Sequence, residues 1–264
     1  MNKRLMRWAK AALVCAGIAL GPAAGATQFS TNFSDLWWVP SESGWGANIS
    51  QQSDTMFVTI FVYGPSGQPT WFVATLDYLF AAPDGSLVWS GDLYQTAGAW
   101  FGTTWNPLLY TSRKVGTATF RAAVVAQATL TYSVDGIVVT KQIERQLLRN
   151  NDNSGSYYGG TTDVSRNCIN PLLNNVRTED EGSLSITQVG PLITIHAPTC
   201  TFAGTYSQQG QIGRAETTYV CTNGAVGSVT FFDMHVETSG VVGRYTGRDP
   251  ICQFDGNIGG YRKQ

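Results

Sequence analysis

Asp233, His235 and Glu237 are the residues whose types and spacing best suit acid–base chemistry. Alternate side chains of a strand point to the same face, so the segment "FFDMHVE" would place all three together. A histidine beside a carboxylate can transfer a proton, and the same groups could also bind a metal ion. The residues between them would lie on the opposite face: Phe232, Met234 and Val236.

The same alternation is typical of a solvent-facing strand over an apolar core, and we favour this interpretation. A single strand supplies poor geometry for a metal ion, and the only other mature histidine, His196, is distant in sequence. We therefore expect neither a metal nor a cofactor, and we keep the three residues as catalytic candidates of a hydrolase. The chain has no Gly-x-Ser-x-Gly motif, phosphate-binding loop or dinucleotide fingerprint.

The segment "DLWWVPSESGWGANISQQ", Asp35–Gln52, concentrates three tryptophans, Trp37, Trp38 and Trp45. Indole rings stack on sugars or pack on flat apolar ligands, but they also fill cores and close the mouths of barrels. Because Trp37 and Trp38 point to opposite faces of a strand, at most one lies in the core if the other face is wet. The candidate ligand-binding residues are Trp37, Trp45, Trp71, Trp100 and Glu42.

Two further features bear on this binding hypothesis. Glu42 could accept hydrogen bonds from a ligand hydroxyl or, as we favour, from backbone N–H groups of its own turn. The expected strand Thr55–Tyr63 is apolar on both faces, so each face needs cover. One face could line a barrel, while the other meets a flap, the partner domain or a ligand.

The N-terminus has the form of a secretory signal. Basic residues precede an uncharged run, Ala11–Ala24, and Ala24-Gly25-Ala26 has the small-x-small pattern that signal peptidase cleaves. Residues 1–26 should therefore be removed, which predicts a secreted or periplasmic protein of a Gram-negative bacterium. No other apolar run is long enough to span a bilayer, so no transmembrane segment is expected.

The charge balance argues against polyanion partners. Four of the 17 basic residues lie in the signal, which leaves 13 against 18 acidic residues and a net charge of about −5. We expect no nucleic-acid partner, because such binding relies on clustered Lys and Arg. A small molecule or a glycan is the partner that the aromatic residues suggest.

Four cysteines follow the signal: Cys168, Cys200, Cys221 and Cys252. An even number in an exported chain indicates disulfides, with three possible pairings. If Thr201–Gln208 and Glu216–Cys221 form a hairpin, Cys200 lies opposite Cys221, and Cys168 is left with Cys252. The crossed pairings stay open at this point.

The composition favours short strands and tight turns, with 29 glycines, 12% aromatic and 13% charged residues. We expect an all-β chain of two tandem antiparallel up-and-down meanders, each a small barrel or a sandwich. For the second meander the barrel is favoured, because closure removes exposed edges. The expected strands are Gly44–Gln52, Thr55–Tyr63, Pro69–Leu79, Ser86–Gln95, Gly116–Ala123, Ala128–Val134 and Ile137–Gln146, then Gly155–Thr161, Ser183–Gln188, Leu192–Ala197, Thr201–Gln208, Glu216–Cys221, Ser228–Glu237, Val241–Thr246 and Cys252–Tyr261.

The polar segment 149–155, "RNNDNSG", is the expected linker. It separates a Trp-rich domain, 27–148, from a disulfide-stapled, barrel-like domain, 156–264. Every mature tryptophan precedes this linker, and every mature cysteine follows it. Within the first domain, the irregular stretch Gly98–Lys114 is rich in aromatic residues and is a candidate flap.

The pattern Trp-Trp-x-Pro-x-Glu-Ser-Gly-Trp-Gly, followed by Tyr-x-x-x-Gly-x-Pro-x-Trp, runs from Trp37 to Trp71. In this pattern the first domain resembles a group of uncharacterised secreted proteobacterial proteins, which implies export and no particular activity. The second domain, with "FAGTYSQQG" and "FDGNIGGY", loosely resembles small avidin- or lipocalin-type barrels. That resemblance bears on fold alone.

These observations favour an exported, non-catalytic binding or surface module whose aromatic residues hold a carbohydrate or a small apolar molecule. Two alternatives remain. One is a secreted hydrolase that uses the acids and histidine of a barrel face. The other is an envelope-structural or adhesion protein whose aromatic residues bury against a partner chain.

Overall fold

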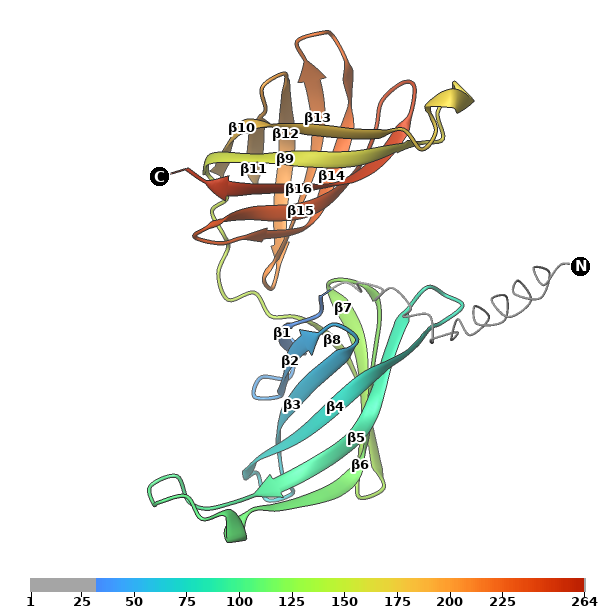
Figure 1. Cartoon of the computed structure of the whole chain (residues 1–264). Coiled ribbons are helices and arrows are strands. Elements are labelled where there is room, and N and C mark those ends of the chain that lie inside the picture. Colours follow the sequence, from blue (N-terminus) through green and yellow to red (C-terminus); the bar gives the residue numbers. More distant parts are fainter. Residues whose placement is uncertain (1–31, 264) are drawn as a thin grey trace, which may run out of the picture.

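A computed structural model describes residues 32–263, and over this range the chain forms two closed antiparallel β-barrels (Figure 1). This confirms the prediction of two all-β meanders and, for the second domain, the preference for a barrel over a sandwich; the first domain is a barrel too. Both barrels are up-and-down meanders in which each strand pairs with its sequence neighbours and the last strand pairs with the first. The expected signal, residues 1–26, lies outside the described residues.

The first barrel closes through a short strand that pattern alone did not delimit. β1 is only four residues long, and it pairs with both β2 and the end of β8, where Trp37 lies opposite Arg145. The strands are β1 Asp35–Trp38, β2 Gly46–Gln52, β3 Thr55–Tyr63, β4 Pro69–Ala81, β5 Leu87–Ala97, β6 Thr111–Val124, β7 Gln127–Val134 and β8 Ile137–Arg145, with a 3-10 helix η1 at Pro107–Leu109.

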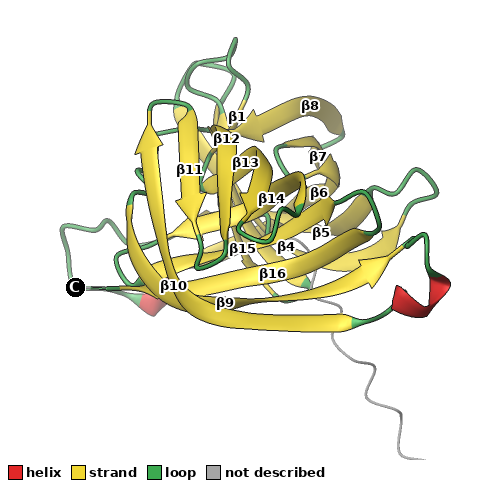
Figure 2. Ribbon diagram, turned by 90° about the horizontal axis from the view of Figure 1, so that it is seen from above, coloured by secondary structure: helices red, strands yellow, loops and turns green. Residues whose placement is uncertain are grey.

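The second barrel begins after the connecting residues 146–154 and repeats the same topology. Apart from two short 3-10 helices, strands dominate the described chain (Figure 2). The strands are β9 Gly155–Arg166, β10 Arg177–Val189, β11 Leu192–His196, β12 Cys200–Gln209, β13 Ile212–Cys221, β14 Val226–Val236, β15 Gly240–Arg248 and β16 Gln253–Arg262, with η2 at Pro171–Leu173.

Successive turns of an up-and-down barrel alternate between its two ends, which gives each barrel a joint end and a distal end. The joint ends face each other, because the β12–β13 turn donates a hydrogen bond from the Gln211 N–H to Asp35 at the start of β1 (2.8 Å). The distal end of the first barrel carries the β1–β2, β3–β4, β5–β6 and β7–β8 connections. The long β5–β6 hairpin projects from that end (Figure 1).

Aromatic side chains fill the interior of the first barrel. Phe33, Trp89 and Phe120 meet edge to face, with ring centroids 5.4 to 6.0 Å apart, and Trp37 packs on Phe120 at 5.4 Å. Aliphatic residues from the remaining strands complete the cluster. The interior of the first barrel is therefore filled by its own side chains.

Both disulfides lie at the distal end of the second barrel. Cys200 and Cys221 are direct partners in the β12–β13 ladder, and their bond closes the mouth of that hairpin. Cys168, after β9, is bonded to Cys252, before β16. The expected pairings are therefore confirmed. No helix within residues 32–263 is long and apolar enough to cross a membrane.

Candidate functional site

Trp37 and Trp38 divide between the two faces of β1, as the alternation of a strand predicts. Trp37 is 1% exposed and lies in the core, with the Arg145 guanidinium 5.0 Å from its ring centroid. Its indole N–H donates to the Phe33 carbonyl at 3.0 Å. Trp37 is therefore a packing residue, and its place among the candidate ligand-binding residues is corrected.

Trp45 and Glu42 build the distal mouth of the first barrel. The half-buried Trp45 indole donates to the Tyr132 hydroxyl at 3.1 Å and packs against the core. The Glu42 carboxylate pairs with the Lys141 ammonium at 2.5 Å, and Lys141 also lies 5.9 Å from the Trp45 ring centroid. The preferred expectation that the Glu42 side chain accepts from its own turn was wrong, because a cation from β8 reaches it instead.

An exposed aromatic surface lies on the outside of β3 and β4, and we call Phe61, Tyr63 and Trp71 the platform. Phe61 and Trp71 are direct cross-strand partners, 45% and 54% exposed, and Tyr63 is two residues beyond Phe61 on the same face. Cβ atoms of such partners lie about 5 Å apart, so the two rings share one patch. The outer face of β3 thus stays uncovered, while its inner face is buried.

Two contacts position the platform. The Trp71 indole N–H donates to the Thr96 hydroxyl of β5 at 3.3 Å. The Tyr63 ring lies against Gly44, where a Cβ atom would approach the Tyr63 hydroxyl to 2.6 Å. Gly44 also has a φ of +95°, which favours glycine. The Glu-Ser-Gly-Trp-Gly segment therefore closes the barrel mouth and makes room for Tyr63.

The charged groups around the distal end form pairs of opposite sign. Lys114 pairs with Asp92 at 2.8 Å, and Arg113 makes a two-pronged pair with Asp135 at 2.6 and 2.9 Å. Hydrogen bonding to Arg113 holds the pKa of Asp135 below its usual value, so this carboxylate stays ionised at neutral pH. The surroundings of the platform are therefore close to electrically neutral.

Trp100 lies on the β5–β6 connection rather than on the platform. β6 begins at Thr111, earlier than expected, so the irregular segment is residues 98–110, which we call the flap. Trp100 and Phe101 have ring centroids 5.6 Å apart, and both are exposed. Of the predicted ligand-binding tryptophans, only Trp71 and Trp100 therefore present a large open surface.

The structure corrects the faces assigned to the "FFDMHVE" segment. A bulge between Phe232 and His235 interrupts the β14–β15 ladder, and Asp233 within it has a φ of +50°. The extra residue shifts the alternation, so Phe231 is buried and Phe232 lies outside beneath the Arg244 guanidinium. Sequence periodicity did not indicate this bulge, because aspartate tolerates both backbone conformations.

Asp233, His235 and Glu237 are consequently not assembled as a catalytic group. Asp233 is ion-paired with Arg244 and lines a hollow between the barrels, whereas His235 and Glu237 line a separate groove of about 660 Å³ floored by glycines. Within the described residues, no hydrogen bond joins His235 to either acid, and no group of three or more His, Cys, Asp or Glu residues is placed to hold a metal. His196 lies at the distal end of its barrel, where it contacts Thr201.

His235 nevertheless occupies a distinctive electrostatic position. Burial lowers the pKa of its imidazole, and the positive charge of Arg145 from the first barrel lowers this pKa further. The carboxylates of Asp233, Glu237 and Asp35 oppose both effects. The pKa of a histidine in the second barrel thus depends on a charge in the first barrel.

The joint itself is built around a buried ion pair that sequence analysis missed. Arg145 donates to Asp35 at 2.9 Å, and the two side chains are almost completely buried. Gly210 of the second barrel, with a φ of +58°, fits against them so closely that a Cβ atom would lie 2.1 Å from the Asp35 carboxylate. Only the presence of a carboxylate and an arginine near the ends of the first domain could have hinted at this contact.

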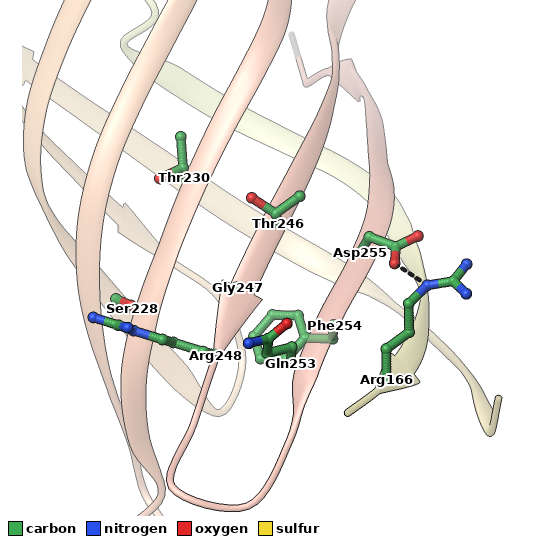
Figure 3. A pocket seen from close by; sticks show the side chains of 9 residues that line it. All are labelled: Arg166, Ser228, Thr230, Thr246, Gly247, Arg248, Gln253, Phe254 and Asp255. Carbon is green, nitrogen blue, oxygen red and sulfur yellow. Dashed lines mark hydrogen bonds and ion pairs between the residues drawn. The ribbon is translucent and has the colours of Figure 1, made fainter. Parts of the chain in front are cut away.

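A shallow polar hollow of about 400 Å³ lies on the outer face of β14, β15 and β16 (Figure 3). Thr230, Thr246 and Asp255 form one cross-strand row along it. Asp255 is ion-paired with Arg166, which neutralises the charge at one edge. The hollow contains none of the predicted site residues, so the platform remains the candidate site that connects sequence and structure.

No family model, curated protein or solved structure matches the chain.

Proposed function

We propose that the protein is an exported, non-catalytic binding module that holds a neutral carbohydrate on the platform of its first barrel. The observation that carries this proposal is the exposed cross-strand pair Phe61 and Trp71, on the outside of a barrel whose interior is filled by its own side chains. Aromatic faces left open in this way suit stacking against the apolar face of a sugar ring.

The shape of the platform favours a carbohydrate over a small apolar molecule. Small apolar ligands bind in clefts that enclose most of their surface. The platform is instead the outer face of a closed barrel, so a ligand would contact it on one side only. The neighbouring outward-facing positions include the apolar Val73 and Phe57 and also three polar residues that could hydrogen-bond to sugar hydroxyls: Asn48, Thr59 and Thr75.

The electrostatics favour a ligand without charge. The acids and bases nearest the distal end are paired with each other, as in Lys114 with Asp92 and Lys141 with Glu42. A charged ligand would have to displace one partner of such a pair. A neutral glycan requires no such exchange, and its hydroxyls match the amide and hydroxyl groups beside the platform.

Export is supported by the two disulfides, which form and persist in oxidising compartments. A hydrolytic function has less support. The Asp233 carboxylate is held by Arg244, and His235 shares a groove with Glu237 without a hydrogen bond between them. The adhesion alternative would place a partner chain on the same aromatic surface. A test of that alternative would therefore measure the binding of a protein, rather than a polysaccharide, to the platform.

Affinity electrophoresis in native gels that contain neutral polysaccharides, with xylan, dextran and hydroxyethyl cellulose as probes, tests the proposal. We expect retardation of the protein by at least one probe and loss of that retardation in Trp71→Ala. Leu79→Ala, on the same strand and also exposed, is the matched control and should migrate like the wild type. Retardation that survives Trp71→Ala would contradict the carbohydrate assignment. So would a fatty acid that displaces an apolar dye from the wild-type protein but not from Trp71→Ala.

A further inference from the structure

The flap, residues 98–110, presents large apolar side chains directly to water. Phe101 is 94% exposed and Leu108 is 89% exposed, and Trp100, Trp105, Leu109 and Tyr110 are also open. Burying a Leu or Phe side chain stabilises a fold, so a fold that leaves two of them in water forgoes that stabilisation. An exposed apolar surface of this kind marks an interaction site.

The flap holds these residues in a defined arrangement rather than collapsing them onto the barrel. The side chain of Asn106 accepts a hydrogen bond from the Leu108 N–H and caps the η1 helix. The Thr103 hydroxyl donates to the Trp100 carbonyl at 2.9 Å. The Trp105 ring folds back over Gly98, at the base of the flap.

Charge is missing from the flap and concentrated at its base. From Leu93 to Ser112 the sequence contains no Asp, Glu, Lys or Arg. The first charged residues beyond this run, Asp92, Arg113 and Lys114, belong to the ion pairs at the end of the barrel. The flap therefore combines exposed apolar side chains with tryptophan and tyrosine and carries no charge, and the paired ions lie where it joins the barrel.

We propose that the flap inserts into the interface of a lipid bilayer and docks the distal end of the first barrel on a membrane surface. A bilayer can accommodate each of these groups, with acyl chains innermost, Trp and Tyr at the headgroup level, and charged groups in the water beyond. The acyl chains of a fluid bilayer can surround the exposed side chains of Phe101 and Leu108. A protein partner would need a deep apolar pocket to bury both of them.

The chain contains a near-copy of one turn of the flap, and the residues around this near-copy differ from those of the flap. Asn170-Pro171-Leu172-Leu173 repeats the sequence Asn106-Pro107-Leu108-Leu109, and both form a 3-10 turn capped by the asparagine. Leu172 is 85% exposed, close to the value for Leu108. Arg166 and Arg177 flank this second turn, and it carries no aromatic residue, so it should not enter lipid.

Flotation with phosphatidylcholine vesicles tests the proposal. The wild-type protein should float with the vesicles, and added NaCl should not release it, because the flap carries no charge to screen. Replacing two exposed apolar residues of the flap with aspartate, in Phe101→Asp/Leu108→Asp, should lower the partition coefficient of the protein between vesicles and water roughly tenfold or more. Leu172→Asp, in the near-copy, should bind as the wild type does.

A second measurement detects insertion directly, starting from the wild-type protein. Phosphatidylcholine brominated on its acyl chains should quench part of the tryptophan emission of the wild-type protein, and Trp100→Phe/Trp105→Phe should abolish that quenching. Trp71→Ala should leave vesicle binding intact, which separates this proposal from the carbohydrate proposal. The absence of flotation and quenching would overturn it. So would equal losses in the Leu172→Asp variant, or a dimer in solution that the flap variant dissociates.

Discussion

The two barrels share one topology but treat their distal ends in opposite ways. The second barrel closes its distal end with two disulfides, at Cys168–Cys252 and Cys200–Cys221. The first barrel has no cysteine in its described residues, and its distal end projects an uncharged aromatic flap. A closed meander can thus be stabilised by an aromatic core or also by disulfide bonds, and the barrel without disulfides in its described residues has a distal end that projects into water.

The contents of the two interiors differ as well. The first barrel encloses Trp37, Trp89 and Phe120 in edge-to-face contact. The second barrel encloses tyrosines and also a polar contact, in which the Tyr245 hydroxyl donates to Asp163 at 3.1 Å. Burial raises the pKa of Asp163. The first barrel also encloses polar groups, the buried pair Asp35 and Arg145, and only the second barrel carries disulfides within the described residues.

The largest expected effect is the loss of the longer disulfide. Cys168→Ser/Cys252→Ser opens a loop of 84 residues, for which loop entropy gives about 4.5 kcal/mol, whereas Cys200→Ser/Cys221→Ser opens one of 21, for about 3.3 kcal/mol. Urea unfolding followed by circular dichroism should show the second barrel destabilised in that order. Tryptophan fluorescence reports the first barrel alone among the described residues, and its transition should not move. A common shift of both transitions would contradict the independence of the two cores.

Breaking the buried ion pair should weaken the first barrel in the complementary way. Asp35→Ala leaves the Arg145 guanidinium buried without its carboxylate, which costs about 3–5 kcal/mol. The tryptophan-monitored urea transition should move accordingly. The double variant Asp35→Leu/Arg145→Met removes both charges and should recover most of the loss. If the single and double variants lose the same stability, packing rather than charge holds this end.

A smaller loss of stability is expected from a substitution that pushes the two barrels apart at their joint ends. Gly210→Ala places a Cβ atom 2.1 Å from Asp35, and it also forces alanine into a left-handed backbone with a φ of +58°. Gly190→Ala is the matched control, because its φ is +57° and nothing lies within 4 Å of its added Cβ. Both should lose about 1–2 kcal/mol from strain. Small-angle scattering should show an increased radius of gyration for Gly210→Ala only, and equal radii would mean that this turn does not join the barrels.

The smallest effect is a pH dependence at the joint. The folded-state pKa of His235 is lower than the usual value of about 6.5, so the unfolded chain binds more protons between the two values. The free energy of unfolding should therefore fall as pH drops below about 6.5 and level off below the folded pKa. His235→Gln should remove this slope. In Gly210→Ala, NMR titration should find the pKa of His235 raised, because Arg145 moves away; an unchanged value would assign the shift to burial alone.

Much of the fold follows from local patterns in the sequence. The strand Thr55–Tyr63 has the bounds that its alternation and flanking turns predict, and the hairpin at Gly210-Gln211 brings Cys200 opposite Cys221 as its register requires. The division of Trp37 and Trp38 between two faces follows from the two-residue period. These features need no information beyond neighbouring residues, since pleat and turn chemistry act over a few positions.

The candidate site could be predicted only in part. Sequence analysis singled out Trp71 and Trp100, but it also selected Trp37, which the closure of β1 on β8 buries. It took Asp233 and His235 as neighbours on one face, because a single left-handed residue that creates a bulge has no periodic signal. The near-identity of the two Asn-Pro-Leu-Leu turns illustrates the limit: their local structure is the same, and only their surroundings differ.

Local patterns in the sequence predict the all-β class, the tandem meanders, the cysteine pairing favoured by the hairpin, and the uncharged character of the flap. The tertiary structure alone decided which tryptophans are buried and that Asp35 meets Arg145 and Gln211. The physical reason is that period and turn chemistry are local, whereas barrel closure joins strands at opposite ends of a domain. Closure therefore assigns each aromatic residue to the filled interior or to the open surface.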